Sequence, residues 1–162
     1  MADQYEKYRL LCYQIPGVKQ HTNETCWCAA LEWWAKALKN ARPQLNQDQI
    51  YYQYATFAVN GPNASNLIGS AKFKQLLSEA KWKADVQIKP QFGPTFLNQK
   101  LTKGPIILGY WYPTGGHVVV AVAPSITYKD EYMVMDPAIG NFTHYGYGRF
   151  STYQDVLVAV PK

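Results

Sequence analysis

Two cysteines flank a tryptophan in the stretch TNETCWCAALEWWAKAL, residues 22–38. Closely spaced cysteines serve zinc ligation, thiol–disulfide exchange or nucleophilic attack by a single thiolate. Zinc sites usually separate paired cysteines by about two to four residues, and redox pairs are normally C-x-x-C. The C-x-C spacing fits neither pattern, and on a helix it turns the two thiols about 200° apart. The sequence therefore predicts no metal site and no cofactor, and it favours one nucleophilic cysteine.

Cys26 is the expected nucleophile. A helix that begins near Thr25 places Cys26 in its first turn, where unpaired backbone N–H groups and the helix dipole stabilise a thiolate. Gln20 lies six residues upstream, so it can fold back and offer its side-chain amide to an oxyanion, beside the backbone N–H of Cys26. No glutamine precedes Cys28 at this spacing, because position 22 is threonine. Cys26 is therefore preferred over Cys28.

His117 and Asp136 are the expected base and its orienting carboxylate. His117 opens the apolar run HVVVAVAP, and Asp136 ends the next one, YMVMDP. Antiparallel pairing of these strands would bring Asp136 back towards His117, and Pro137 favours an extended Asp136. A carboxylate there would fix the tautomer of the imidazole. Taken alone, His117 would be a structural histidine and Asp136 a turn residue, and Asn141 is the alternative orienting group.

The order of these motifs resembles the papain-like cysteine peptidases of clan CA. The motifs are Gln20, Cys26-Trp27 with two alanines after Cys28, Gly116-His117 and Asp136-Pro137. The similarity is closest to the small bacterial branch that includes the AvrRpt2-type effectors and the C39-like peptidases. It implies Cys26 as nucleophile, His117 as general base and acid, Asp136 as orienting residue and Gln20 in the oxyanion hole. Cys28 departs from the branch, which usually has alanine or another small residue there.

The resemblance implies hydrolysis of peptide bonds in a protein or peptide substrate. The candidate substrate-binding residues are Trp27, Gly116 and Trp111, with core packing as the alternative for Trp111. The same constellation also serves a glutamine deamidase or transglutaminase-like toxin, which is the enzymatic alternative. A catalytically inactive papain-like module that binds peptides is the non-enzymatic one.

The expected biological setting follows from the same resemblance. It is a bacterial effector or toxin, secreted or injected into a target cell and acting in a reducing cytosol, with an immunity or inhibitor protein as a second partner. The polar N-terminus MADQYEKYRL predicts no cleavable signal peptide, and no apolar run is long enough for a membrane span.

The 16 Lys and Arg residues are scattered, and the densest cluster, 72–83, is expected to be the solvated face of a helix. Nucleic acid is therefore not an expected partner.

The composition and the hydrophobic pattern predict one α+β domain over residues 1–162. Aromatic residues make up 15% and charged residues 17%, which excludes a disordered tail or a coiled coil. Residues 1–25 are expected to be irregular with one extended piece, 8–18, and Cys12 within it to be a buried thiol. Helices are expected at 25–38, 46–59, 68–80 and 95–104, and strands at 105–112, 117–124, 132–137 and 155–160. This order predicts a papain-like fold, with an N-terminal helical half packed on a C-terminal antiparallel β-sheet.

Overall fold

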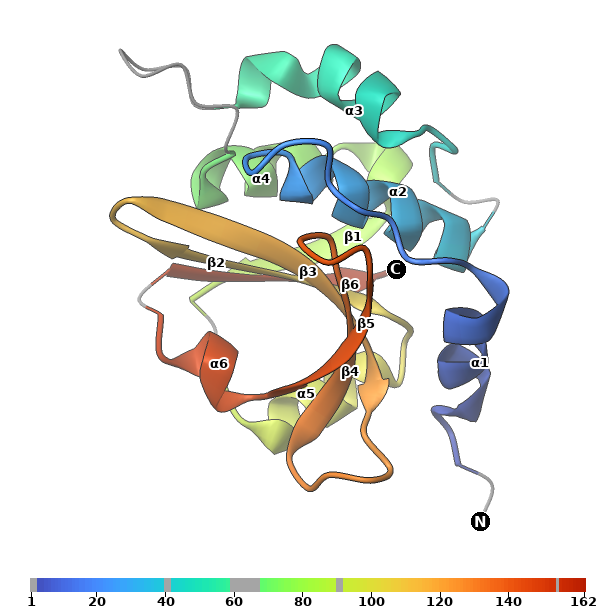
Figure 1. Cartoon of the computed structure of the whole chain (residues 1–162). Coiled ribbons are helices and arrows are strands. Elements are labelled where there is room, and N and C mark those ends of the chain that lie inside the picture. The colour runs from blue at the N-terminus through green and yellow to red at the C-terminus, as the bar shows by residue number, and fades with distance from the viewer. Residues whose placement is uncertain (1–2, 40–41, 59–67, 90–91, 154) are drawn as a thin grey trace.

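One antiparallel sheet organises the chain (Figure 1). The computed structural model describes residues 3–39, 42–58, 68–89, 92–153 and 155–162. Within these residues the strand order is β1-β6-β2-β3-β4-β5, and every neighbouring pair is antiparallel. The strands are β1 (Ala84–Ile88), β2 (Ile106–Tyr112), β3 (Gly115–Pro124), β4 (Glu131–Asp136), β5 (Asn141–Gly146) and β6 (Asp155–Pro161).

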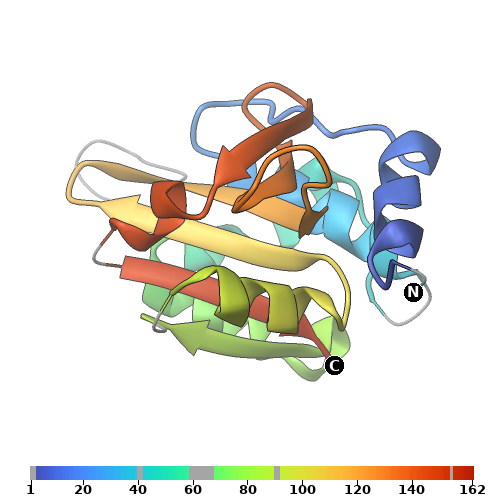
Figure 2. The same cartoon turned by 90° about the horizontal axis from the view of Figure 1, so that it is seen from below.

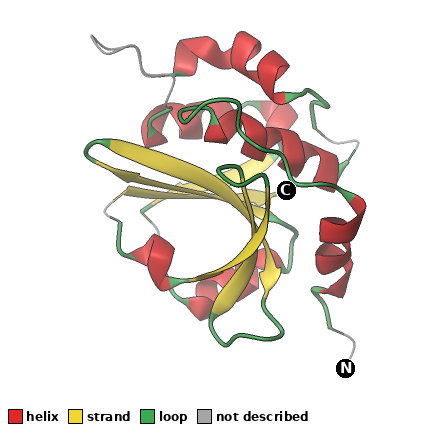
Figure 3. Cartoon of the chain, viewed as in Figure 1, coloured by secondary structure: helices red, strands yellow, loops and turns green. Residues whose placement is uncertain are grey.

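Helices cover both faces of this sheet (Figure 3). They are α1 (Glu6–Gln14), α2 (Cys26–Leu38), α3 (Gln47–Tyr54), α4 (Ser70–Leu77), α5 (Pro94–Leu101) and α6 (Gly148–Ser151), with short 3-10 turns at Ala55–Phe57 and Ala80–Trp82. Helices α2, α3 and α4 lie over one face, and α5 lies across the other, as the view from below shows (Figure 2). The α+β prediction is confirmed. None of the described helices is long and apolar enough to cross a membrane.

Helix α2 is the central element of the core. Trp27, Leu31 and Trp34 recur on it at helical spacing and have no exposed surface, and Leu38 at its end is partly buried. The indole N–H of Trp34 donates to the carbonyl of Pro105 at 2.7 Å, so its burial leaves no polar group unpaired. Because the helix packs against β3 and α3 at once, the position of its first residue relative to the sheet is fixed by the core.

The prediction for the N-terminal segment was wrong. Residues 6–14 form helix α1 rather than an irregular or extended segment. The residues that pack against the core recur at helical spacing, and they are Tyr8, Leu11, Cys12 and Ile15. The helix ends where Ile15 becomes extended, because Pro16 disfavours the helical conformation in the residue before it. Cys12 is partly buried, with its sulfur 3.2 Å from that of Met133.

Strands β1 and β5, at the two edges of the sheet, were not among the predicted strands. Each mixes exposed side chains with buried or partly buried ones, without a continuous apolar run. The other four strands and helices α2 to α5 fall on the predicted segments, with ends that differ by a few residues. The assignment of 1–162 to a single domain stays a prediction.

Candidate active site

His117 and Asp136 meet across the β3–β4 pair. β3 enters the sheet just before His117, which lies opposite Tyr110 of β2, and β4 ends at Asp136. The Nε2 atom of His117 is 2.6 Å from Oδ1 of Asp136. The carboxylate is buried, with 3% of its residue surface exposed, so this contact is largely shielded from water.

Asp136 accepts hydrogen bonds from three groups. Besides His117, the backbone N–H of Ala138 donates to Oδ1 at 2.8 Å. The hydroxyl of Tyr145, on the neighbouring strand β5, donates to Oδ2. Burial alone would raise the pKa of Asp136, but the hydrogen bonds from His117 and Tyr145 outweigh it and lower the pKa to about 2. The carboxylate is therefore ionised at any pH near neutrality and holds the imidazole by one oxygen.

Cys26 is the second partner of the His117 imidazole. Burial alone would lower the pKa of His117, but hydrogen bonds and charge interactions with Asp136 and Cys26 raise it to about 9. Because Asp136 occupies Nε2, the nitrogen that remains for Cys26 is Nδ1. An imidazole between a carboxylate and a thiol is the arrangement in which the ring can serve as the base for a nucleophilic cysteine.

The sulfur of Cys26 lies beneath the molecular surface. Cys26 is the first residue of α2, after Thr25, and has no exposed surface. Access of a substrate carbonyl to this sulfur therefore requires movement of the side chains around it. Cys28 is also fully buried, and desolvation raises the pKa of its thiol. No cluster of three or more His, Cys, Asp or Glu residues that could hold a metal occurs in the described part of the chain.

Gln20 is positioned by the turn that follows Asp136. Its backbone N–H donates to the carbonyl of Pro137 at 2.9 Å. Three residues earlier, the chain passes so close to this turn that a Cβ on Gly17 would lie 2.5 Å from the carbonyl oxygen of Gly140. The side-chain Nε2 of Gln20 donates to the carbonyl of Thr22 at 2.7 Å, which leaves its second N–H available. The buried Oε1 has no partner among the described residues.

Gln20 and His117 line one cleft of about 330 Å³. The other lining residues come from the loop before α2, from β2 and β3, from the end of β4 and the turn after it, and from α6 and the segment between α6 and β6, and they are Asn23, Tyr110, Tyr112, Gly116, Asp136, Ala138, Arg149 and Tyr153. The structure thus brings Gln20, His117 and Asp136 to one cleft, and the side chain of Cys26 interacts with the imidazole of His117. Sequence reasoning missed Tyr110, Tyr145 and Arg149.

The three predicted substrate-binding residues occupy different positions. Gly116 lines the cleft, and a Cβ there would lie 2.3 Å from Cδ1 of Trp111. Trp111 is largely buried, and its indole N–H donates to the carbonyl of Ile68 at 2.8 Å. Trp27 has no exposed surface, so its burial gives no support to a contact with substrate.

Asn141, the alternative to Asp136 as the orienting residue, is exposed, and its side-chain oxygen accepts a hydrogen bond from the N–H of Phe142 instead.

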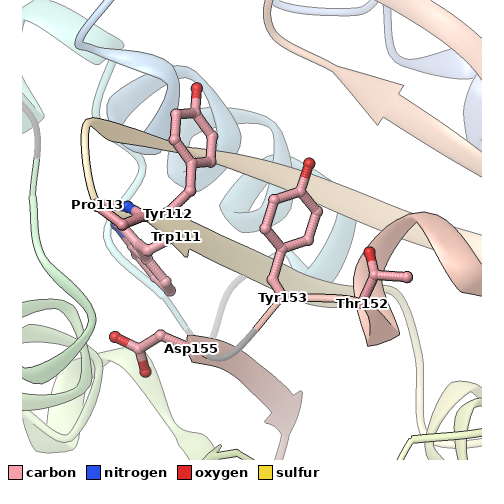
Figure 4. Close-up of a pocket in the computed structure, with 6 residues that line it drawn as sticks. All are labelled: Trp111, Tyr112, Pro113, Thr152, Tyr153 and Asp155. Carbon is pink, nitrogen blue, oxygen red and sulfur yellow. The ribbon is translucent and has the colours of Figure 1, made fainter.

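A second cavity of about 490 Å³ adjoins this cleft. It is lined by Trp111, Tyr112, Pro113, Thr152, Tyr153 and Asp155 (Figure 4). Tyr112 and Tyr153 border both cavities, and their ring centroids are 6.0 Å apart. Figure 4 shows their hydroxyls pointing to the same side, with the Asp155 carboxylate on the other side. Tyr112 and Tyr153 therefore lie between the cleft beside His117 and a second pocket that is lined by the carboxylate of Asp155.

The fold is that of a known peptidase domain. No protein-family model matches the sequence, and the search of curated proteins gave no match. Among solved structures, the chain is similar to the peptidase domain of Streptococcus ComA, a bi-functional ABC transporter involved in a quorum sensing pathway. The TM-score is 0.61 over 91% of this chain and 98% of that domain, at 14% sequence identity. The predicted papain-like fold is confirmed at this level of similarity, which concerns the fold alone.

Proposed function

We propose that the chain is a cysteine peptidase that cleaves peptide bonds with Cys26, His117 and Asp136. The observation that carries the proposal is the 2.6 Å contact between His117 Nε2 and Asp136, with Cys26 as the other hydrogen-bond partner of the same imidazole. A purely structural histidine has no need of a thiol on one nitrogen and a buried carboxylate on the other. The similarity in fold to a peptidase domain supports the same function.

The first half of the proposed reaction is acylation of the thiol. The thiolate of Cys26 attacks the carbonyl carbon of the substrate, a C–S bond forms, and the π electrons move onto the carbonyl oxygen. The backbone N–H of Cys26 and the free N–H of Gln20 then stabilise the oxyanion. The imidazolium of His117 gives its proton to the leaving nitrogen as the C–N bond breaks. An acyl-enzyme and an amine product result.

The second half is hydrolysis of the thioester. His117, now neutral, removes a proton from water, and the hydroxide oxygen attacks the acyl carbon. Collapse of the second tetrahedral intermediate breaks the C–S bond, releases the carboxylic acid and restores the thiolate beside the imidazolium. Asp136 holds the ring orientation throughout and carries no proton, which agrees with its lowered pKa.

The proposal also includes two more specific points that the sequence resemblance implies, the branch of the family and the biological role. The comparisons support a papain-like peptidase fold and give no support to the AvrRpt2-type branch, so the C39-like branch is the better choice. A role as a bacterial effector or toxin, secreted or injected into a target cell and bound by an immunity protein, rests on the sequence resemblance alone.

A single experiment tests this function against its alternatives. The protein and its Cys26→Ala variant are incubated under reducing conditions with a proteome-derived peptide library, and products are read by mass spectrometry. New peptide termini that are absent with Cys26→Ala support a peptidase. Conversion of glutamine to glutamate without cleavage would overturn the proposal in favour of a deamidase. Peptide capture without any product, by both proteins equally, would overturn it in favour of a binding module.

A further inference from the structure

The cleft beside His117 contains a positive charge that the proposed reaction does not use. Arg149, from α6, lines the same cleft as Gln20 and His117 and is itself exposed. The carboxylate of Asp136 already accepts from His117, Ala138 and Tyr145. None of the ion pairs within the described residues includes Arg149. Its charge is therefore available to a molecule that enters the cleft.

The guanidinium of Arg149 is held in place before any ligand binds. Its central carbon lies 3.9 Å from the ring centroid of Tyr145, the residue whose hydroxyl donates to Asp136. Stacking uses the flat face of the guanidinium and leaves the N–H groups at its edge to bind acceptors, one of which is the nearby hydroxyl oxygen of Tyr110. Since the side chain is already ordered by this contact, binding through it costs less conformational entropy than binding through a free arginine.

A buried hydroxyl lies next to this guanidinium. Tyr110 is 3% exposed, and its O–H has no acceptor within the described residues, since the neighbouring guanidinium of Arg149 can only donate to its oxygen. Burial raises the pKa of Tyr110 to about 12, and the nearby Arg149 partly opposes that rise. The hydroxyl is therefore a protonated donor near neutral pH. A buried donor without an acceptor is costly, so an acceptor supplied by a ligand would be favoured.

We propose that Arg149 and the Tyr110 hydroxyl form a recognition site for a carboxylate of the substrate, next to the scissile bond. The inference rests on the proposed peptidase function. A guanidinium edge pairs with two carboxylate oxygens, and a neighbouring O–H can donate to one of them. The carboxylate comes either from an Asp or Glu side chain or from a free C-terminus of the peptide.

The neighbouring cavity directs an acidic group to the Arg149 side. Asp155 lines that cavity, beyond the Tyr112–Tyr153 pair, and one of its oxygens accepts from the hydroxyl of Ser70. A carboxylate placed there would face another carboxylate with no cation in the lining, whereas the lining of the cleft adds the cations of Arg149 and His117 to the carboxylate of Asp136. The two pockets thus favour opposite charges, and the substrate carboxylate has one preferred position.

The test compares enzyme variants with paired substrates. Peptides from a cleaved sequence carry Glu or Gln at each position near the scissile bond, and a second series carries a C-terminal acid or amide. For the wild type, loss of the recognised carboxylate should lower kcat/KM on the order of tenfold, as expected for a charged hydrogen bond. In Arg149→Gln this difference should vanish, and in Tyr110→Phe it should shrink. Lys129→Gln, an exposed site in the β3–β4 loop with the same change of charge, should keep it.

The substrate pairs separate recognition from indirect effects on catalysis. If Arg149→Gln slows acidic and amide peptides equally, the residue only supports Tyr145, and the inference is wrong. The side-chain series and the C-terminal series show which source of carboxylate is used.

A binding readout keeps this result independent of cleavage. Cys26→Ala protein is used to capture peptides from a random library. Enrichment of acidic peptides that is lost in the double variant with Arg149→Gln supports the site even if no peptide is cut. Equal capture of acidic and neutral peptides would overturn it.

Discussion

The hydroxyl of Tyr145 donates to Oδ2 of Asp136, the oxygen that His117 does not use. Because His117 and Ala138 both hold Oδ1, the Tyr145 contact fixes the rotation of the carboxylate and so the direction in which Oδ1 points. The orientation of the imidazole therefore depends on a residue of the edge strand β5, nine positions after Asp136.

We expect Tyr145→Phe to lower kcat roughly tenfold with little change in KM, since a hydrogen bond to a charged group is lost while the ring keeps its packing. The pKa of Asp136 should rise, because one of the hydrogen bonds that lower it is removed, so the acidic limb of the pH–rate profile should move to higher pH. Tyr147→Phe, two residues away, is the control and should behave as wild type. An unchanged profile in Tyr145→Phe would show that Tyr145 is not needed to orient Asp136.

Alkylation should distinguish the three thiols. With iodoacetamide near neutral pH, Cys26 should react first, because within the part of the chain that the structure describes Cys26 is the thiol that interacts with a histidine. Burial raises the pKa of Cys12 to about 12 and also raises that of Cys28, so both are almost entirely protonated at this pH. Since the sulfur of Cys26 is buried, a bulky maleimide should react with it more slowly than a small maleimide such as N-methylmaleimide does.

Peptide mapping by mass spectrometry identifies the labelled cysteine in each sample. The variant His117→Asn should lose the fast labelling of Cys26. Labelling of Cys28 before Cys26 would contradict the assignment of the nucleophile.

The stability of the fold should be greatest in mildly acidic solution. The pKa of Asp136 is about 2 in the folded protein against an ordinary 3.8, so its contribution is present above 3.8 and is lost as the pH falls towards 2. The pKa of His117 is about 9 against 6.5, so its contribution is complete below 6.5 and is lost as the pH rises to 9. Urea unfolding at a series of pH values measures both contributions to the free energy of unfolding. In the variant His117→Gln, this free energy should no longer fall between pH 6.5 and 9. A wild-type protein whose unfolding free energy stays constant over that range would refute the stabilising contribution of His117.

Gly116 is required by the close approach of Trp111. A Cβ at position 116 would lie 2.3 Å from Cδ1 of an indole that is fixed by its hydrogen bond to Ile68. Gly116→Ala should therefore displace the indole or the start of β3, with a loss of about 1–3 kcal/mol in unfolding free energy, typical of overpacking. Gly146→Ala is the matched control, because nothing lies within 4 Å of its Cβ. Equal thermal stability of the two variants would contradict this account.

The elements that could be predicted from the sequence are those with a continuous run of apolar residues that the fold buries. Strands β2, β3, β4 and β6 are apolar runs with covered faces, so composition alone locates them. Strand β1 at one sheet edge has only five residues, and β5 at the other edge shows no strict alternation of buried and exposed positions, so neither has a continuous apolar run that would locate it. Helix α1 was missed because its apolar residues were interpreted as an extended run, although they recur at helical spacing.

The candidate site was predictable only where residue type and order are distinctive. Gln20, Cys26, His117 and Asp136 were singled out by their spacing and order, and the structure places them next to one another. Tyr145 and Arg149 gave no such signal. The chain has 13 tyrosines, and nothing in their spacing marks the one that reaches Asp136. The role of Arg149 depends on the return of α6 to the cleft, which is a property of the folded chain.

Gln20 tests the proposed oxyanion hole, because one of its amide N–H groups is already used by the carbonyl of Thr22 and the other is free. Gln20→Ala should reduce kcat by about 10²–10³, the usual effect of removing one oxyanion donor, with KM nearly unchanged. Gln14→Ala, an exposed glutamine at the end of α1, is the control and should keep wild-type kinetics. Gln20→Glu keeps the shape but brings a negative charge towards the oxyanion, so it should be at least as damaging as Gln20→Ala. Steady-state kinetics on a cleaved peptide measure all three variants, and a Gln20→Ala enzyme with full kcat would remove Gln20 from the oxyanion hole.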